Sequence, residues 1–138
     1  MLKQLSVFVE NRVGATTEAT GALAEANVNL RAMCLADTTD FGILRLIVEE
    51  PERAADILRA KGMVVNVCNV LAIILPDEPG AFHKVLCLLS GAGINVEYSY
   101  AFLTIHPGKA EIILRVREEE KAAALLKDAG YACISIQH

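Results

Sequence analysis

Two short stretches of the sequence combine residues that could bind a small charged molecule. An amide or acid stands three residues before a glycine, and the spacing from Gly14 to Asn29 equals that from Gly80 to Asn95. A glycine lets a ligand approach the main chain, and a helix starting there offers free N–H groups and partial positive charge to a carboxylate. Asn11, Asp77 and the two later asparagines can accept hydrogen bonds from an ammonium group. A zwitterionic amino acid meets both needs.

Each of these residues also has a purely structural explanation. Asp77 can cap a helix, and Gly80 can shape the turn before it. Asn29 and Asn95 can satisfy main-chain groups where a helix passes into a strand. The equal spacing in two copies favours the binding interpretation over the structural one.

Other residues that could do chemistry lack the partners that their chemistry needs. Cys87 follows His83 by four residues, a spacing that permits a nucleophilic pair, but no third group is placed to orient the histidine. The helical pattern also predicts Cys87 on the inner face of its helix. The four cysteines form no C-x-x-C pair and no zinc spacing, so reduced thiols in a cytoplasmic protein are expected. No catalytic residue, metal or cofactor is expected.

Composition and patterning argue against nucleic-acid and membrane partners. Tyr98, Tyr100 and Phe102 could stack on RNA bases, but they alternate in register with Ile94 and Val96, which predicts that they belong to the core. The net charge of −4 argues against binding to nucleic acid or an anionic membrane. No apolar run reaches the roughly 18 to 20 residues that span a bilayer, and no signal-peptide pattern is expected at the start.

The elements that must position the two stretches are themselves repeated. Residues 5–30 match 71–96 at an offset of 66, and residues 50–65 match 118–133 at an offset of 68. The offset changes where a hairpin turn is expected, because turns absorb insertions. We therefore expect two domains, 1–68 and 69–138, each near the lower size limit for an independent core.

Each repeat predicts the same order of elements. Strands are expected at 4–10, 28–36, 42–49 and 63–67, with helices at 14–26 and 51–61. The second repeat predicts helices at 81–92 and 118–129, strands at 94–102, 112–116 and 132–136, and a type II turn at Pro107-Gly108. This order, β-α-β-β-α-β, is the ferredoxin-like α+β unit.

The strand faces pointing away from the helices are expected to be apolar. These positions are Phe8, Met33, Ile43, Ile47, Ala72, Ile74, Leu103 and Ile113. Such a face should be buried by another sheet. We infer that the antiparallel sheets of the two repeats join side by side and that the chain forms a homodimer.

The second stretch resembles the ACT domain, a small regulatory module of amino-acid metabolism. Asp77-x-Pro79-Gly80-Ala81-Phe82 is similar to its D-x-P-G-x-L/F opening, and Gly91-x-Gly93-Ile94-Asn95-Val96 to its G-x-N-I/V passage into the second strand. The first repeat is looser, since Asn11-x-Val13-Gly14 has no proline and Ala26-Asn27-Val28-Asn29 replaces the glycine. The resemblance covers nearly the whole chain as two tandem ACT domains.

The resemblance implies that a free amino acid binds at the interface between two such domains, without catalysis. It implies that Asn11, Val13 and Gly14 face Asn95, and that Asp77, Pro79 and Gly80 face Asn29. Side-chain selectivity would come from neighbours: Arg12, Thr16, Arg31, Phe82, His83 and Glu97. A metabolic enzyme, a transporter or a neighbouring subunit would respond to the form of the protein that holds the amino acid. The alternative is an assembly module that holds a protein partner and binds no small molecule.

Overall fold

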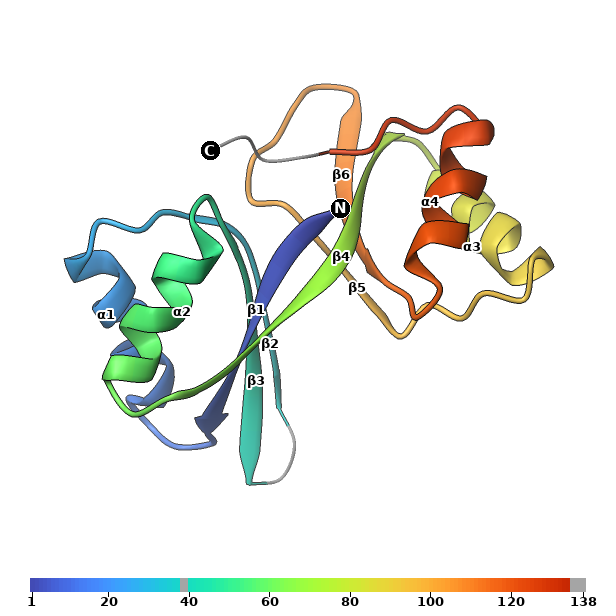
Figure 1. Ribbon diagram of the computed structural model, residues 1–138. Helices are drawn as coiled ribbons and strands as arrows, with labels where there is room; N and C mark the ends of the chain where they lie inside the picture. The colour runs from blue at the N-terminus through green and yellow to red at the C-terminus, as the bar shows by residue number, and fades with distance from the viewer. Residues whose placement is uncertain (38–39, 135–138) are drawn as a thin grey trace. The chain divides into compact units, whose positions relative to one another are not determined.

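The computed structural model describes residues 1–37 and 40–134 (Figure 1). The chain divides into two compact units: Lys3–Cys68, called the first unit here, and Asn69–Ile136 with Met1–Leu2, called the second unit. Thr38 and Thr39, which belong to the hairpin turn expected where the repeat offset changes, and the last two residues of the strand expected at 132–136 lie outside the described residues. No helix of the described chain is long and apolar enough to cross a bilayer.

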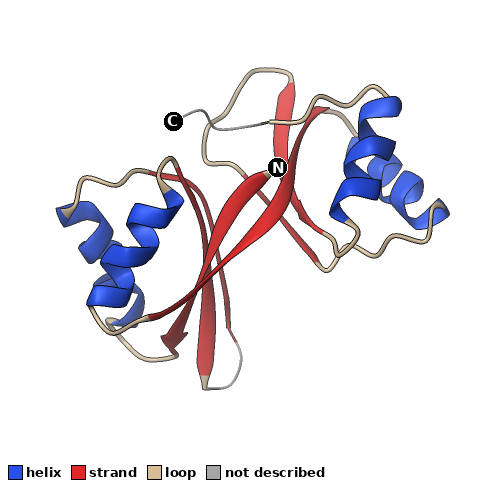
Figure 2. Cartoon of the chain, in the orientation of Figure 1, coloured by secondary structure: helices blue, strands red, loops and turns tan. Residues whose placement is uncertain are grey.

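The first unit has the predicted order of elements. Its strands are β1 (Leu2–Glu10), β2 (Leu30–Asp37), β3 (Phe41–Val48) and the part of β4 (Val64–Pro76) up to Cys68; its helices are α1 (Ala15–Glu25) and α2 (Pro51–Ala60). The strands lie in the order β2-β3-β1-β4, with β3 antiparallel to both β1 and β2. Both helices lie on one face of this sheet (Figure 2).

The core of the first unit lies between that sheet face and the two helices. Leu5, Val7 and Val9 alternate along β1 and are buried with Leu44 and Leu46 of β3. The helices contribute small and aliphatic side chains to the same cluster: Ala15, Ala19, Ala22, Leu23, Ala54, Ala55 and Leu58. A fully buried leucine stabilises the fold by about 1.5–3 kcal/mol. The buried residues of α1 recur three or four positions apart and therefore form one stripe along the helix.

The second unit repeats this arrangement with the rest of β4, then α3 (Ala81–Gly91), β5 (Tyr98–Ala101), β6 (Lys109–Arg115) and α4 (Glu119–Asp128). β6 pairs antiparallel with β4 and with β5. Within the described residues, the predicted last strand is reduced to a bridge between Ile73 and Cys133. The expected last strand of the first repeat and first strand of the second are one strand, β4, because no glycine or proline interrupts them.

The second strand of the second unit is shorter than predicted, and its tyrosines lie on the face of the sheet opposite to the predicted one. β5 begins only at Tyr98, and there Ser99 pairs with Leu114 while Tyr100 pairs with Ile113. Leu114 belongs to the core beneath the helices, so Ser99 shares that face and the tyrosines lie on the opposite one. The prediction that Tyr98 and Tyr100 are core residues is wrong. Their rings are half-buried and stack with centroids 6.4 Å apart.

Two other side chains, Met33 and Cys87, also lie where the pattern did not place them. The pairing of β2 shifts between Leu30 and Ala32, so Met33 stands opposite Leu46 on the helix side of the sheet. A shift of one residue moves every later side chain to the other face. In α3, Val85 and Leu89 are buried, whereas Phe82 and Cys87 are exposed. Cys87 is therefore on the outer face of its helix, contrary to prediction.

The remaining side chains of the expected apolar face differ widely in exposure. Ile47, Ala72 and Ile113 are buried, Ile43 and Ile74 are half-buried, and Phe8 and Leu103 are exposed. Side-by-side joining of the sheets and homodimer formation stay predictions.

The ends of α1 and α3 explain why the first repeat can lack the glycine that follows the first helix of the second repeat. Asn27 has φ 59° where α3 has Gly93 at φ 75°. The same hydrogen bond follows each, from Val28 N–H to Leu23 O and from Ile94 N–H to Leu89 O, both at 2.9 Å. Asparagine adopts this left-handed conformation more readily than most residues, so the helix ends alike in both units.

Candidate functional site

The loop between the first strand and the first helix has the same main-chain hydrogen bonds in both units. Asn11 N–H donates to Asp40 O at 3.0 Å, and Asp77 N–H donates to Gly108 O at 3.0 Å. Three further main-chain hydrogen bonds of the first loop have a counterpart 66 residues later. In the first loop the N–H groups of Arg12, Ala15 and Glu18 donate to the carbonyls of Glu10, Arg12 and Gly14. In the second loop the N–H groups of Glu78, Ala81 and Lys84 donate to the carbonyls of Pro76, Glu78 and Gly80. The same loop is therefore built twice from different side chains.

A glycine in the left-handed conformation begins each helix. Gly14 has φ 90° and Gly80 has φ 84°, and both are N-cap residues without a side-chain cap. A Cβ added at Gly80 would meet nothing within 4 Å. The backbone conformation, and not crowding, is therefore what requires glycine here.

Free main-chain donors point out of both helix starts. The main-chain amides of Thr16 and Thr17 have no hydrogen-bond acceptor within residues 1–37 and 40–134, and neither do those of Phe82 and His83. The loops beside them are exposed, and Val13 is 99% exposed. Asp77 and Pro79 are exposed too, and the Asp77 carboxylate has no hydrogen bond to any described residue. Each loop therefore offers amide donors and the positive end of a helix dipole to an anion.

The two asparagines lie at the other ends of the same helices. Asn29 follows α1 and Asn95 follows α3, and both are exposed. Each helix has 11 residues, so about 16 Å separates its two ends at 1.5 Å per residue. A loop and the asparagine of its own unit cannot hold one amino acid. The expected pairings, Asn11, Val13 and Gly14 with Asn95, and Asp77, Pro79 and Gly80 with Asn29, stay predictions.

Both arginines expected to contribute selectivity are held in surface ion pairs. Arg12 donates from Nε to Glu10 at 2.9 Å and from Nη2 to Glu18 at 3.1 Å. Hydrogen bonds to Glu18 and then Glu10 raise the pKa of Arg12 above its ordinary value. Arg31 pairs with Glu49 at 3.0 Å. A ligand carboxylate would have to compete with these side chains for either guanidinium.

Asn95 lines a hollow that contains both signs of charge. The hollow has a volume of about 340 Å³, and its other lining residues are Gly93, Glu97, Arg117 and Glu118. Glu97 Oε1 lies 3.9 Å from Arg117 Nε and also 3.9 Å from Arg115 Nε. Carboxylate, guanidinium and carboxamide groups together suit a ligand that carries both charges.

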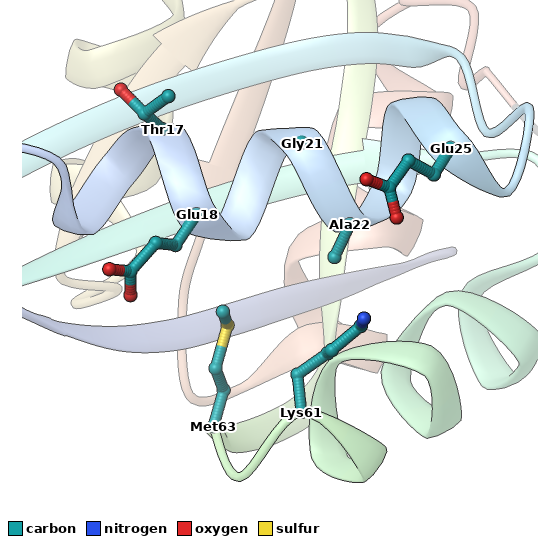
Figure 3. Close-up of a pocket in the computed structure, with 7 residues that line it drawn as sticks. All are labelled: Thr17, Glu18, Gly21, Ala22, Glu25, Lys61 and Met63. Atoms are coloured by element: carbon teal, nitrogen blue, oxygen red, sulfur yellow. The ribbon is translucent and has the colours of Figure 1, made fainter.

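A groove on the flank of α1 was missed by the sequence analysis. It has a volume of about 370 Å³ and is lined by residues of α1 and of the turn after α2: Thr17, Glu18, Gly21, Ala22, Glu25, Lys61 and Met63 (Figure 3). None of the eight predicted ligand residues lines it. Gly21, Ala22 and Met63 stand where the second repeat has Cys87, Leu88 and Tyr131. Comparing side-chain sizes between the repeats could have found it.

Comparisons with known proteins agree with this architecture. The family model described as an ACT domain pair matches residues 1–134. Protein BT0572 from Bacteroides thetaiotaomicron is similar in structure, with a TM-score of 0.90, 39% identity, and coverage of 96% of this chain and 91% of that one. No curated protein matches.

Two further solved structures share the fold at low sequence identity. The regulatory subunit of aspartate kinase from Thermus thermophilus, in a ligand-free form, has a TM-score of 0.69 and 14% identity, covering 94% of this chain and 93% of that one. The corresponding subunit from Thermus flavus has a TM-score of 0.65 and 14% identity, covering 94% of both chains. The family match over 1–134, together with the loop built twice, shows that the chain belongs to the ACT domain family as a tandem pair of ACT domains.

Proposed function

We propose that this chain is a regulatory protein that binds a free amino acid and performs no catalysis. The observation that carries the proposal is the loop built twice, with a left-handed glycine and helix-start amides that have no acceptor among the described residues. Similarity to regulatory subunits of aspartate kinase supports a regulatory role. The amides suit the carboxylate of an amino acid, and Asn11 or Asp77 suits its ammonium group.

In this proposal, the second half of each site comes from another ACT domain. Because Asn29 and Asn95 lie at the far ends of their own helices, each can complete only a loop that belongs to a different domain, in this chain or in another copy. A ligand held in this way stabilises one arrangement of two domains over others by its difference in affinity, and couplings of this kind are typically about 1–3 kcal/mol. A partner enzyme or transporter would respond to that arrangement.

Calorimetry with each of the twenty amino acids tests the proposal. We expect one or a few to bind, and we expect Asn29→Ala or Asn95→Ala to weaken binding roughly tenfold or more, since a hydrogen bond to a charged group contributes about 1.5–3 kcal/mol. Asn66→Ala removes an exposed carboxamide from β4 that is not among the predicted ligand residues, and serves as the matched control. Absence of binding at millimolar concentrations of every amino acid would contradict the proposal.

We also propose that the protein works in a reducing compartment, the cytoplasm. All four cysteines are free, and two of them, Cys87 and Cys133, are exposed. Disulfides persist mainly in oxidising compartments. Fractionation of cells that express the tagged chain checks this placement.

A second candidate function, assembly with a protein partner, is favoured by one apolar surface. Phe8 is 43% exposed, Phe41 55% and Val64 64%, and all three line one hollow beside α1. The second repeat has Ile74, Lys109 and Ala132 at these positions, so the surface belongs to the first unit. Dimer formation lost in Phe8→Ser, with a melting temperature that no amino acid changes, would favour this candidate over the sensor.

A further inference from the structure

His83 and Cys87 form a close pair on the outer face of α3. The Cys87 sulfur lies 3.3 Å from His83 Nε2 and 4.0 Å from Nδ1, and both side chains are exposed. Residues four apart on a helix are neighbours, so α3 itself fixes this geometry. The pair lies outside the core of the second unit.

The fold does not require this pair. The corresponding residues of the first unit are Thr17 and Gly21, and α1 has the same length as α3. A Cβ added at Gly21 would meet nothing within 4 Å. Folding of the repeat therefore accounts for neither the cysteine nor the histidine, and their contact provides a chemical ability that the first unit lacks.

The other cysteines do not have this surrounding. Cys34 and Cys68 are half-buried, and the Cys68 sulfur lies 3.6 Å from the Gln4 side-chain nitrogen. Cys133 is exposed but has no histidine contact among the described residues. Cys87 is therefore distinguished from Cys133, the other exposed thiol, by its imidazole neighbour.

An imidazole at this distance can take up the thiol proton and hold the thiolate beside an imidazolium. A free thiol is only a few per cent thiolate at pH 7, and the thiolate is the nucleophile. Opposite unit charges about 4 Å apart in water favour each other by about fivefold in population. Solvent exposure leaves the sulfur open to small reagents.

We propose that Cys87 is a site of reversible mixed-disulfide formation with low-molecular-weight disulfides, with His83 as its base. The Cys87 thiol proton moves to His83, and the thiolate attacks one sulfur of the disulfide. A new S–S bond forms at Cys87 as the old one breaks, and the departing thiolate takes the proton from His83. Excess free thiol reverses the exchange.

Site-resolved mass spectrometry of the full chain with oxidised glutathione at pH 7 tests the proposal. We expect Cys87 to form the adduct about twofold faster than Cys133, because at pH 7 only about a quarter of ordinary imidazoles carry the charge that gives the fivefold preference. His83→Gln should lower the rate at Cys87 about twofold, to the rate of Cys133, while an unchanged melting temperature shows that the fold is intact. Equal rates at the two cysteines of the wild type, or no effect of His83→Gln, would overturn it.

The duplication provides a matched control in the first unit. Gly21→Cys places a thiol at the position equivalent to Cys87, but with Thr17 in place of the histidine. We expect this thiol to react at the slower rate of Cys133, and we expect Thr17→His combined with Gly21→Cys to raise its rate about twofold. If the added histidine does not accelerate the reaction, helix position and not the imidazole controls reactivity, and the proposal fails.

Discussion

Replacing Gly80 by alanine tests the loop on which the binding proposal depends. Gly80 has φ 84°, and an L-residue other than glycine costs roughly 1–2 kcal/mol in the left-handed region. A Cβ would meet nothing within 4 Å, so no steric term adds to this cost. Gly80→Ala should therefore destabilise the protein by about 1–2 kcal/mol.

The expected change is large enough to measure by thermal denaturation. In a domain of 60–100 residues, 1 kcal/mol shifts the melting temperature by roughly 4–8 °C, and by less if both units unfold together. Gly80→Asn should cost less than Gly80→Ala, because asparagine tolerates this region better, as Asn27 does in this chain.

Gly21→Ala is the matched control, because it makes the same chemical change inside a helix. Gly21 lies within α1, with nothing within 4 Å of an added Cβ. Alanine is favoured over glycine in a helix by roughly 1 kcal/mol, so this variant should melt at a higher temperature than the wild type. A Gly80→Ala variant that melts at or above the wild-type temperature would refute the left-handed loop.

Three further predictions concern other elements. Asn27→Gly should stabilise the protein by up to about 1 kcal/mol in urea denaturation, because glycine adopts the positive φ at the end of α1 without strain. Leu89→Ala should cost about 2–5 kcal/mol and Phe82→Ala much less, since Leu89 is fully buried and Phe82 is 37% exposed; equal losses would contradict the exposure of Phe82. A hydrogen bond from Lys3 at 2.9 Å holds the pKa of Glu52 below its ordinary 4.5, so Lys3→Met should raise it in an NMR titration. Because the folded pKa is the lower one, this pair stabilises above the unfolded pKa, and its contribution disappears as the pH falls through the folded value.

The duplication made the order of strands and helices predictable, whereas local irregularities in strand pairing made the sheet face of some side chains unpredictable. Alternating apolar residues and helix stripes gave the order of elements in both repeats, because burial of one face controls each of them. The register change in β2 and the late start of β5 depend on main-chain pairing with β3 and β6. A single-residue shift of that kind leaves no trace in an alternating pattern, so Met33, Tyr98 and Tyr100 were placed on the wrong faces.

The candidate site was predictable only as separate pieces. Repetition identified the glycines, and the structure gives both of them the same left-handed conformation and the same surrounding hydrogen bonds. The engagement of Arg12 with Glu10 and Glu18 depends on how long, flexible side chains meet across a turn. Residue spacing contains no such information, and it could not show that small side chains leave a groove open beside α1.

The hydrogen bonds from Asn11 to Asp40 and from Asp77 to Gly108 join each glycine loop to the tip of a hairpin. A displacement of the loop must stretch that bond or carry the tip along with it. Each unit thus has a mechanical link from its helix start to a turn between two strands. A partner protein that contacts the turn would therefore respond to a displacement of the loop without contacting a ligand held at that loop.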